Sequence, residues 1–195
     1  MHIGIFLDRD GTINEEVNYL STPAELHLIP GAADAIREAN RLGLKVFIIT
    51  NQSGIARGVL TEEHLAEVHK HLLQLLKVEH AHVDGIYYCP HHPDFGDGQY
   101  RKDCSCRKPD IGMLTQAAKE FDIDLRKSFV VGDRMIDIQT GNNAGATSIL
   151  VLTGYGKEEQ TLLQQHHVHA EHVAGNLYEA VQYIKRSILQ EQSIS

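Results

Sequence analysis

Residues 3–14 form the stretch IGIFLDRDGTIN. Its first part, residues 3–7, is a short apolar run, which is typical of a strand buried on both faces of a sheet. Asp8 and Asp10 follow at once, two positions apart on extended backbone, so both carboxylates can face one pocket. Gly11 lets the chain turn sharply after them. The stretch therefore predicts a buried parallel strand that presents two carboxylates at its carboxyl end.

The rest of the chain alternates strand and helix patterns. Apolar, β-branched runs predict further strands at residues 45–50, 83–89, 129–131 and 147–152. Apolar residues at helical spacing predict helices that start after Pro30-Gly31 and Thr61, that cover 111–121 and 135–144, and that begin near Leu177. Strands that alternate with helices form a parallel sheet covered on both faces. We expect one α/β domain over residues 1–195, a Rossmann-like three-layer sandwich with a mostly parallel central sheet.

Composition narrows the class of partner. The chain has 195 residues, 42% of them hydrophobic, and a net charge of −8. The negative charge argues against nucleic acid or an anionic membrane as the main partner. No stretch approaches the ~20 apolar residues that cross a bilayer, and the first residues do not resemble a signal peptide. Three cysteines make a poor disulfide framework, so we expect a reduced, cytoplasmic protein.

Polar residues gather where the predicted strands end. Thr50 ends one strand and Asp133 follows another, as Asp8 and Asp10 follow the first. In open parallel sheets, ligands bind at the carboxyl ends of the strands, so these side chains are expected at one edge.

These residue types suit phosphoryl transfer. One carboxylate can attack phosphorus, and a second can protonate the leaving oxygen and then deprotonate water. Thr50 can donate to a phosphoryl oxygen, and Lys108 can neutralise its charge. Asp133 can complete a Mg²⁺ site with Asp8 and the backbone carbonyl of Asp10. Each residue alone is explained by a turn, a helix cap or a solvated side chain, but the four motifs together favour the chemistry.

All three cysteines lie in residues 89–109, which read CPHHPDFGDGQYRKDCSCRKP. Three sulfurs and one nitrogen make a full tetrahedral zinc set, supplied by Cys89, His91, Cys104 and Cys106. Full protein ligation leaves no position for water, so such a zinc ion is structural, and it would order a polar loop that delivers Arg107 and Lys108. His92 is the rival ligand to His91, and free thiols in a mobile loop are the alternative interpretation.

Taken together, DRDGT (8–12), Thr50, Lys108 in RKP and Gly132-Asp133 resemble the motifs of the haloacid dehalogenase superfamily of aspartate-nucleophile phosphohydrolases. The resemblance spans residues 5 to about 152. It implies that Asp8 is the nucleophile and Asp10 the acid and base, that Thr50 and Lys108 hold the phosphoryl group, and that Asp8, Asp10 and Asp133 bind Mg²⁺.

Two further motifs narrow the resemblance. TNQSGIARG (50–58) and the CPHHP…CxCRKP loop are similar to those of the D-glycero-D-manno-heptose 1,7-bisphosphate 7-phosphatases and the related histidinol-phosphatases. The resemblance implies Zn²⁺ on the loop and a small phosphorylated sugar as substrate, with heptose 1-phosphate made for nucleotide-activated heptose synthesis. The substrate contacts that it implies are Glu16, Val17, Asn18, Tyr19, Asn51, Gln52, Ser53, Arg107 and Arg134. A lysine is also usual in the family at the position of Arg134, and the arginine keeps the same positive charge.

The segments that carry a cap domain in many members of the superfamily are short here. Residues 14–29 hold only a loop and the other insertion point holds only the cysteine-containing loop, so we expect no large cap, an open site and a monomer. Arg57 is placed to meet a second phosphate, or it is a surface arginine. His69 and His71 are expected at the surface or edge of their helix, and HHVHAEH (166–172) is expected to be a solvated helix end or loop.

Three functions stay open. A heptose phosphatase should need Arg57 and Arg107 for its anionic substrate, whereas a histidinol-phosphatase should have an acidic pocket for the amine. A phospho-acceptor switch lacks the acid and base, because its hydrolysis must be slow, so Asp10 argues against it.

Overall fold

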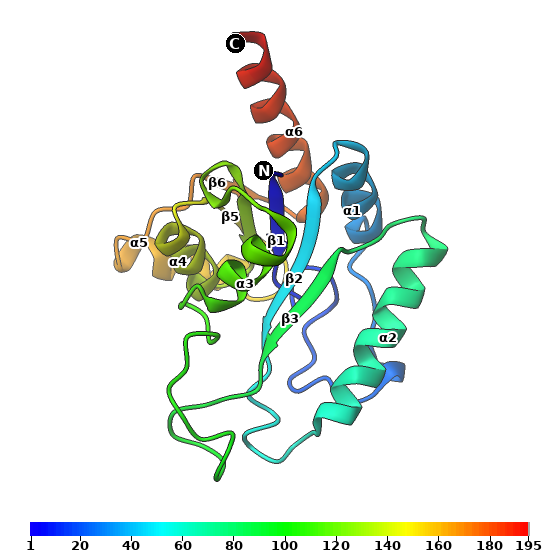
Figure 1. The fold of residues 1–195 in the computed structure, drawn as a ribbon, viewed down its shortest axis with the longest axis vertical. Helices are drawn as coiled ribbons and strands as arrows, with labels where there is room; N and C mark the ends of the chain where they lie inside the picture. Colours follow the sequence, from blue (N-terminus) through cyan, green and yellow to red (C-terminus); the bar gives the residue numbers. More distant parts are fainter. Residues whose placement is uncertain (195) are drawn as a thin grey trace.

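The computed structural model describes residues 1–194, and the side chains of residues 1–190. A six-stranded sheet in the order β3-β2-β1-β4-β5-β6 forms its centre, and every strand pair is parallel (Figure 1). The strands are β1 (Gly4–Leu7), β2 (Lys45–Asn51), β3 (Gly85–Cys89), β4 (Phe129–Gly132), β5 (Thr147–Val151) and β6 (His172–Ala174). The α/β fold expected from the sequence is confirmed.

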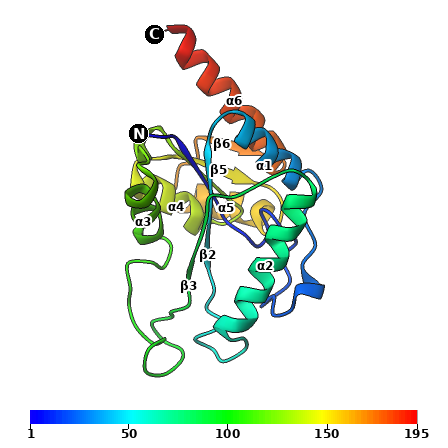
Figure 2. The same ribbon diagram turned by 45° about the vertical axis from the view of Figure 1, so that its right-hand side comes forward.

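Helices cover both faces of this sheet. They are α1 (Ala32–Arg41), α2 (Glu62–Val78), α3 (Gly112–Phe121), α4 (Met135–Ala144), α5 (Gly156–Gln165) and α6 (Leu177–Ile194), with short 3₁₀ turns η1 (Pro23–Glu25) and η2 (Leu125–Lys127). Figure 2 shows α3 and α4 on one side of the strands and α1 and α2 on the other. Helix α6 packs on α1, and its C-terminal end projects from the body of the molecule. None of the helices described is both long enough and apolar enough to cross a membrane.

The apolar run before Asp8 is continuous because β1 is buried on both faces. Ile5 and Leu7 belong to the core on the side of α1 and α6, while Phe6 points to the other face. There the Phe6 ring stacks on the Phe47 ring at 5.1 Å between centroids, and Phe121 of α3 packs edge-on against the Phe47 ring. A central strand with apolar side chains on both faces is what a covered parallel sheet requires.

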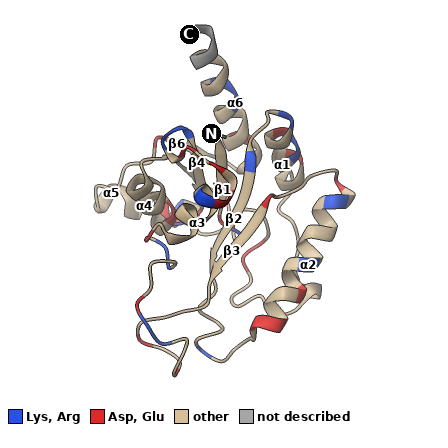
Figure 3. Cartoon of the chain, viewed as in Figure 1, with Lys and Arg blue, Asp and Glu red and all other residues tan. Residues whose placement is uncertain are grey.

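Two connections that follow strand ends frame the carboxyl edge of the sheet. Among the described residues, the connection from β1 to α1 contains only the turn η1, and the connection from β3 to α3 contains no helix or strand of its own. The second connection (residues 90–111) is called the zinc loop because it holds three of the four expected zinc ligands, and it extends beyond the carboxyl ends of β2 and β3 (Figure 1). Basic residues lie along it, as the blue segments in Figure 3 show. The absence of a large cap agrees with the sequence expectation.

The C-terminal third differs most from the expectation. Helix α5 and strand β6 were not predicted: α5 buries a single large apolar side chain, Leu163, and β6 has three residues and begins at the last histidine of HHVHAEH. Edge strands this short leave no periodic signal. The expectation that His69 lies at the surface or edge of its helix is wrong, since its side chain is on the buried face of α2.

Candidate active site

Four of the expected catalytic residues come together at the carboxyl edge of the sheet. Asp8 and Asp10 follow β1, Thr50 lies near the end of β2, and Lys108 arrives from the zinc loop. They border a small hollow of about 60 Å³ that is lined by Asp8, Asp10, Glu16, Thr50, Asn51, Lys108, Arg134, Ile136 and Asp137.

Lys108 is the centre of the charge network. Its side chain is buried, and Nζ donates to Asp8 Oδ1 at 2.7 Å, to Asp137 Oδ1 at 2.6 Å and to the Ile49 carbonyl at 3.0 Å. Burial alone would lower the pKa of Lys108, but the charges of Asp137 and Asp8 outweigh it and raise the pKa. Asn51 fixes the Lys108 backbone, since its Oδ1 accepts from the Lys108 N–H at 3.0 Å and its Nδ2 donates to the Lys108 carbonyl at 3.1 Å. The ammonium group is therefore held charged against Asp8.

Three buried acids lie close enough to share a cation. One oxygen each of Asp8, Asp133 and Asp137 lies within 4.8 Å of the others. Burial, together with the neighbouring acids, raises the pKa of Asp8 to about 7 and that of Asp133 to about 8, although Lys108 acts in the opposite direction. Asp133 Oδ2 accepts from the Tyr155 N–H at 2.8 Å, whereas its buried Oδ1 has no hydrogen-bond partner among the described residues. Hard carboxylate oxygens in this arrangement fit Mg²⁺.

The backbone of two glycines lies against Asp133. A Cβ atom at Gly11 would fall 2.3 Å from Asp133 Oδ2, and one at Gly154 would fall 2.1 Å from the same oxygen. Both residues also have positive φ, which glycine adopts without strain. Because neither glycine has a Cβ atom, the Asp133 carboxylate has room to lie beside Asp8.

Asp137 is a residue that sequence reasoning missed. It is buried in the first turn of α4, where its Oδ2 accepts from the Arg134 N–H at 3.0 Å while its Oδ1 meets Lys108. Its spacing from Asp133, four positions in GDRMID across a strand end and a helix start, is the signal that could have found it.

Asp10 accepts four hydrogen bonds. Arg9 Nε and Asn14 Nδ2 donate to Oδ1 at 3.0 and 2.9 Å, and Arg9 NH2 and Gln52 Nε2 donate to Oδ2 at 2.7 and 3.0 Å. Burial would raise the pKa of Asp10, but the charge and hydrogen bonds of Arg9, with those of Asn14 and Gln52, lower it. Asp10 is therefore a carboxylate in this structure. Arg9, Asn14 and the partner of Arg9, His69, were not among the expected site residues.

A second hollow of about 170 Å³ adjoins the first. Its lining consists of Asp10, Glu16, Asn18, Tyr19, Leu20, Asn51, Gln52, Ser53, Gly54, Arg134 and Tyr155, so most of the expected substrate contacts meet here. Burial and the charge of Asp10 raise the pKa of Glu16, although Arg134 acts against them. The Arg134 guanidinium lies over the Tyr155 ring at 4.9 Å. Gln52 Nε2 also donates to Thr50 Oγ1 at 2.9 Å, which leaves the Thr50 hydroxyl proton free to donate.

Three expected substrate contacts are not brought to either hollow. Val17 packs against the core. Arg57 is exposed, with its guanidinium 3.6 Å from the centroid of Phe95, and it borders a separate cavity of about 980 Å³ between residues 55–63 and 95–100. Arg107 donates from NH1 to the carbonyl of His91 at 3.1 Å, within the zinc loop.

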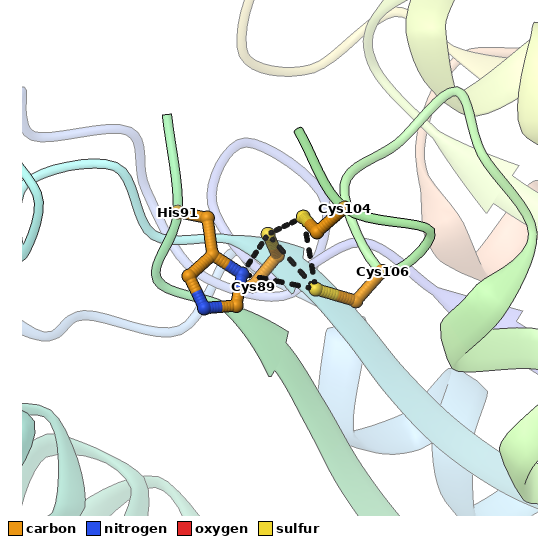
Figure 4. A group of neighbouring side chains, drawn as sticks. All are labelled: Cys89, His91, Cys104 and Cys106. Atoms are coloured by element: carbon orange, nitrogen blue, oxygen red, sulfur yellow. Dashed lines mark hydrogen bonds between the residues drawn. The ribbon is translucent and has the colours of Figure 1, made fainter. Parts of the chain in front are cut away.

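The four expected zinc ligands point toward one another (Figure 4). Cys106 Sγ lies 3.2 Å from Cys89 Sγ and 3.2 Å from Cys104 Sγ, and Cys89 Sγ lies 3.5 Å from Cys104 Sγ. His91 Nδ1 lies 3.3 Å from Cys106 Sγ and 3.7 Å from Cys89 Sγ. Zn–S bonds of about 2.3 Å give tetrahedral edges of roughly 3.7 Å, so the donor set fits one zinc ion.

The rival ligand, His92, lies outside this cluster. Its Nδ1 accepts from the Asp94 N–H at 3.1 Å, and its ring packs against Phe95 with 4.7 Å between centroids. The three cysteines form no disulfide.

Known proteins match both the sequence and the fold. A HAD-hydrolase-like family model matches residues 105–180. A D-glycero-D-manno-heptose-1,7-bisphosphate 7-phosphatase of Chlorobaculum tepidum is 40% identical over 183 residues, 91% of each chain. A D-glycero-beta-D-manno-heptose-1,7-bisphosphate 7-phosphatase of Escherichia coli K12 is 42% identical over 151 residues, 77% of this chain and 79% of that protein.

A solved structure agrees with these relatives. The crystal structure of D,D-heptose 1,7-bisphosphate phosphatase from B. bronchiseptica, in complex with magnesium and phosphate, has a TM-score of 0.82 and 34% identity, and the match covers 98% of this chain and 99% of that one. From its motifs, its fold and these relatives, the chain belongs to the D-glycero-D-manno-heptose-1,7-bisphosphate 7-phosphatase family of the HAD-like hydrolases.

Proposed function

We propose that the chain hydrolyses the 7-phosphate of D-glycero-D-manno-heptose 1,7-bisphosphate and releases heptose 1-phosphate for nucleotide-activated heptose synthesis. The observation that carries this proposal is the convergence of Asp8, Asp10, Thr50 and Lys108 on one hollow. The relatives named for this reaction support the choice of substrate. The substrate is a small phosphorylated sugar, and the proposed enzyme is a single-domain, cytoplasmic monomer whose site is built by one chain.

Mg²⁺ is the proposed catalytic metal, held by Asp8, Asp133 and the backbone carbonyl of Asp10. The unpartnered Asp133 Oδ1 and the three clustered acids support this assignment. When bound, the ion neutralises negative charge on the phosphoryl group and on the carboxylates. Asp137 is a third carboxylate close enough to contact the ion. It also accepts a hydrogen bond from Lys108 and so holds the ammonium group.

In the first step, a carboxylate oxygen of Asp8 attacks phosphorus and the ester P–O bond breaks. The Lys108 ammonium group and the Thr50 hydroxyl donate to phosphoryl oxygens and stabilise the charge that develops there. Asp10, as a carboxylic acid, gives its proton to the leaving sugar oxygen. The negative charge of bound phosphate raises the pKa of Asp10, so this proton enters together with the substrate.

In the second step, Asp10 is the base. It takes a proton from water as the water oxygen attacks phosphorus, and the bond between Asp8 and phosphorus breaks. Asp8 returns as a carboxylate, inorganic phosphate leaves, and Asp10 is again protonated until the product departs. Glu16, Asn18, Tyr19 and Arg134 in the larger hollow are proposed to contact the sugar.

Histidinol phosphate is the second candidate, because one observation favours it. Glu16 places an acidic side chain in both hollows, where a substrate amine could pair with it, whereas Arg57 and Arg107 line neither hollow.

A panel of phosphate esters separates these substrates. We expect phosphate release with Mg²⁺ to show the highest kcat/KM for one anomer of heptose 1,7-bisphosphate, ahead of fructose 1,6-bisphosphate and histidinol phosphate. Glu16→Gln is a useful companion variant: it should reduce kcat/KM for histidinol phosphate far more than for a sugar bisphosphate, if both are turned over. A preference of the native protein for histidinol phosphate would overturn the proposed substrate and keep the catalytic residues.

We also propose that Zn²⁺ occupies the Cys89, His91, Cys104 and Cys106 cluster and orders the zinc loop. Cys106→Ser should release zinc, seen by metal analysis, and should lower kcat/KM by about 100-fold, since a displacement of about 1 Å at Lys108 is enough for such a loss. Ser105→Ala, an exposed neighbour in the same loop, is the matched control and should keep both zinc and activity. Protein purified without chelators and found free of zinc would contradict this account of the loop.

A further inference from the structure

Arg9, the residue between the two strand-end acids, is fully buried. Arginine is rarely found in such a position unless each edge of its guanidinium is paired. Its Nε and NH2 form two parallel hydrogen bonds to the Asp10 carboxylate, and its NH1 lies 3.1 Å from Nε2 of His69 on α2. The guanidinium therefore joins Asp10 to a side chain from the helix that covers this part of the sheet.

His69 is built to be an acceptor for Arg9. Its side chain is 8% exposed, and burial, with the nearby charge of Arg9, lowers its pKa to about 3. The ring is therefore neutral, and its Nε2 offers a lone pair to the Arg9 N–H. A protonated ring would have only N–H donors, and the guanidinium has no acceptor atom to pair with them.

Neighbours hold the His69 ring in place. Tyr88 of β3 packs edge-on against it at 5.9 Å between centroids. The Tyr88 hydroxyl donates to Glu62 Oε2 at 2.5 Å, and Tyr100 of the zinc loop donates to Glu62 Oε1 at 2.9 Å. His69 is thus fixed by α2, by β3 and, through Glu62, by the zinc loop.

We propose that His69 is a positioning residue for the reaction, which fixes the Arg9 guanidinium and thereby the orientation of the Asp10 carboxylate. The inference rests on the proposed role of Asp10 as acid and base. Two of the four hydrogen bonds to Asp10 come from Arg9, and they keep their parallel geometry only while the guanidinium cannot rotate. The acceptor at NH1 removes that rotation, and a proton donor must be oriented to within about 10–20° to be effective.

The test uses two esters with different leaving groups. Departure of p-nitrophenolate needs little help from an acid, whereas departure of a sugar oxygen needs a proton, and kcat/KM reports the steps up to that departure. His69→Leu removes the acceptor and keeps an apolar side chain. We expect it to lower kcat/KM for heptose 1,7-bisphosphate by about tenfold, a fraction of the roughly 10²–10⁴-fold that a general acid contributes. For p-nitrophenyl phosphate we expect a loss of about twofold or less.

Two further variants make the result specific. His69→Gln offers an amide oxygen to Arg9 and should recover most of the loss on the sugar ester. His71→Leu is the matched control on the same helix, where His71 lines a different hollow beside η1, and it should leave both esters unaffected. Thermal unfolding of each variant identifies any that fail to fold.

Equal losses on both esters, no loss on either, or no recovery in His69→Gln would overturn the proposal. Asp10→Asn separates failure of the positioning role from failure of the proposed function. It should also lower kcat/KM more for the sugar ester than for p-nitrophenyl phosphate, and by a larger factor than His69→Leu. If Asp10→Asn shows that difference between the esters and the His69 variants do not, only the positioning role falls. If Asp10→Asn lacks it, the acid role of Asp10 falls, and the positioning role falls with it.

Discussion

Asp8→Asn is expected to lower kcat for phosphate release by at least about 10⁴-fold and to leave the fold intact. An amide oxygen of the same shape cannot form the bond to phosphorus. The fold should tolerate the change, because Asp8 lies among buried acids and its pKa is already raised to about 7. Removing its charge lessens that repulsion, and Lys108 keeps Asp137 as a partner.

The measurement is steady-state phosphate release together with thermal unfolding followed by circular dichroism. Asp84→Asn is the matched control: Asp84 pairs with Lys45 near the amino ends of β2 and β3, away from the carboxyl edge, and its loss should not affect turnover. If Asp8→Asn kept more than about one hundredth of the native kcat, the nucleophile would be another group.

Lys108→Met is expected to damage both stability and activity. It leaves Asp8 and Asp137 buried without their shared cation, and removing one partner of a buried pair costs about 3–5 kcal/mol. It also removes a charged donor to the phosphoryl group, which should lower kcat/KM by about 10²–10³-fold. Denaturant unfolding without Mg²⁺ and phosphate release with Mg²⁺ measure the two effects.

The stability loss in Lys108→Met should grow with pH. In the folded state the pKa of Asp8 is raised to about 7, well above its unfolded value, so the folded state binds more protons and loses stability as pH rises toward the folded pKa. Without Lys108 that pKa rises further, so the extra loss appears above about pH 7. Lys102→Met, an exposed change in the same loop, is the control. A deficit that is the same at pH 6 and pH 8 would argue that the lost interaction is not electrostatic.

The sequence predicts the catalytic edge of the sheet well where the reactive side chains directly follow a strand. Asp8, Asp10, Thr50 and Asp133 each lie at or next to the end of an apolar run, and the rule that parallel strands present ligands at their carboxyl ends brings them together. Lys108 is different, since it sits on a loop with no periodic pattern, and its position follows only from the motif that it belongs to. The Cys89–His91 and Cys104–Cys106 spacings each predict a pair of zinc ligands, and the fold of the loop brings the two pairs together.

What the sequence did not reveal depends on contacts between distant residues. Arg9 between two acids looks like an exposed arginine, but it is buried and its partner His69 lies 60 positions away. His69 lies four positions after Leu65 and three before Leu72, on the buried face of α2, so this helical spacing is the signal that could have predicted its burial. The substrate contact of Arg57 stays a prediction: its guanidinium lies on Phe95 and borders a cavity separate from the catalytic hollow.

The most direct test of the account is to trap the phosphoenzyme. Heptose 1,7-bisphosphate carrying ³²P in its 7-phosphate is mixed with excess enzyme and Mg²⁺, quenched in acid within milliseconds, and digested for peptide mapping. We expect label to appear and then decay on the peptide that contains Asp8, and none to appear on the same peptide of Asp8→Asn. Release of labelled phosphate with no label on that peptide at any time, from native protein that turns the ester over, would contradict the proposed mechanism.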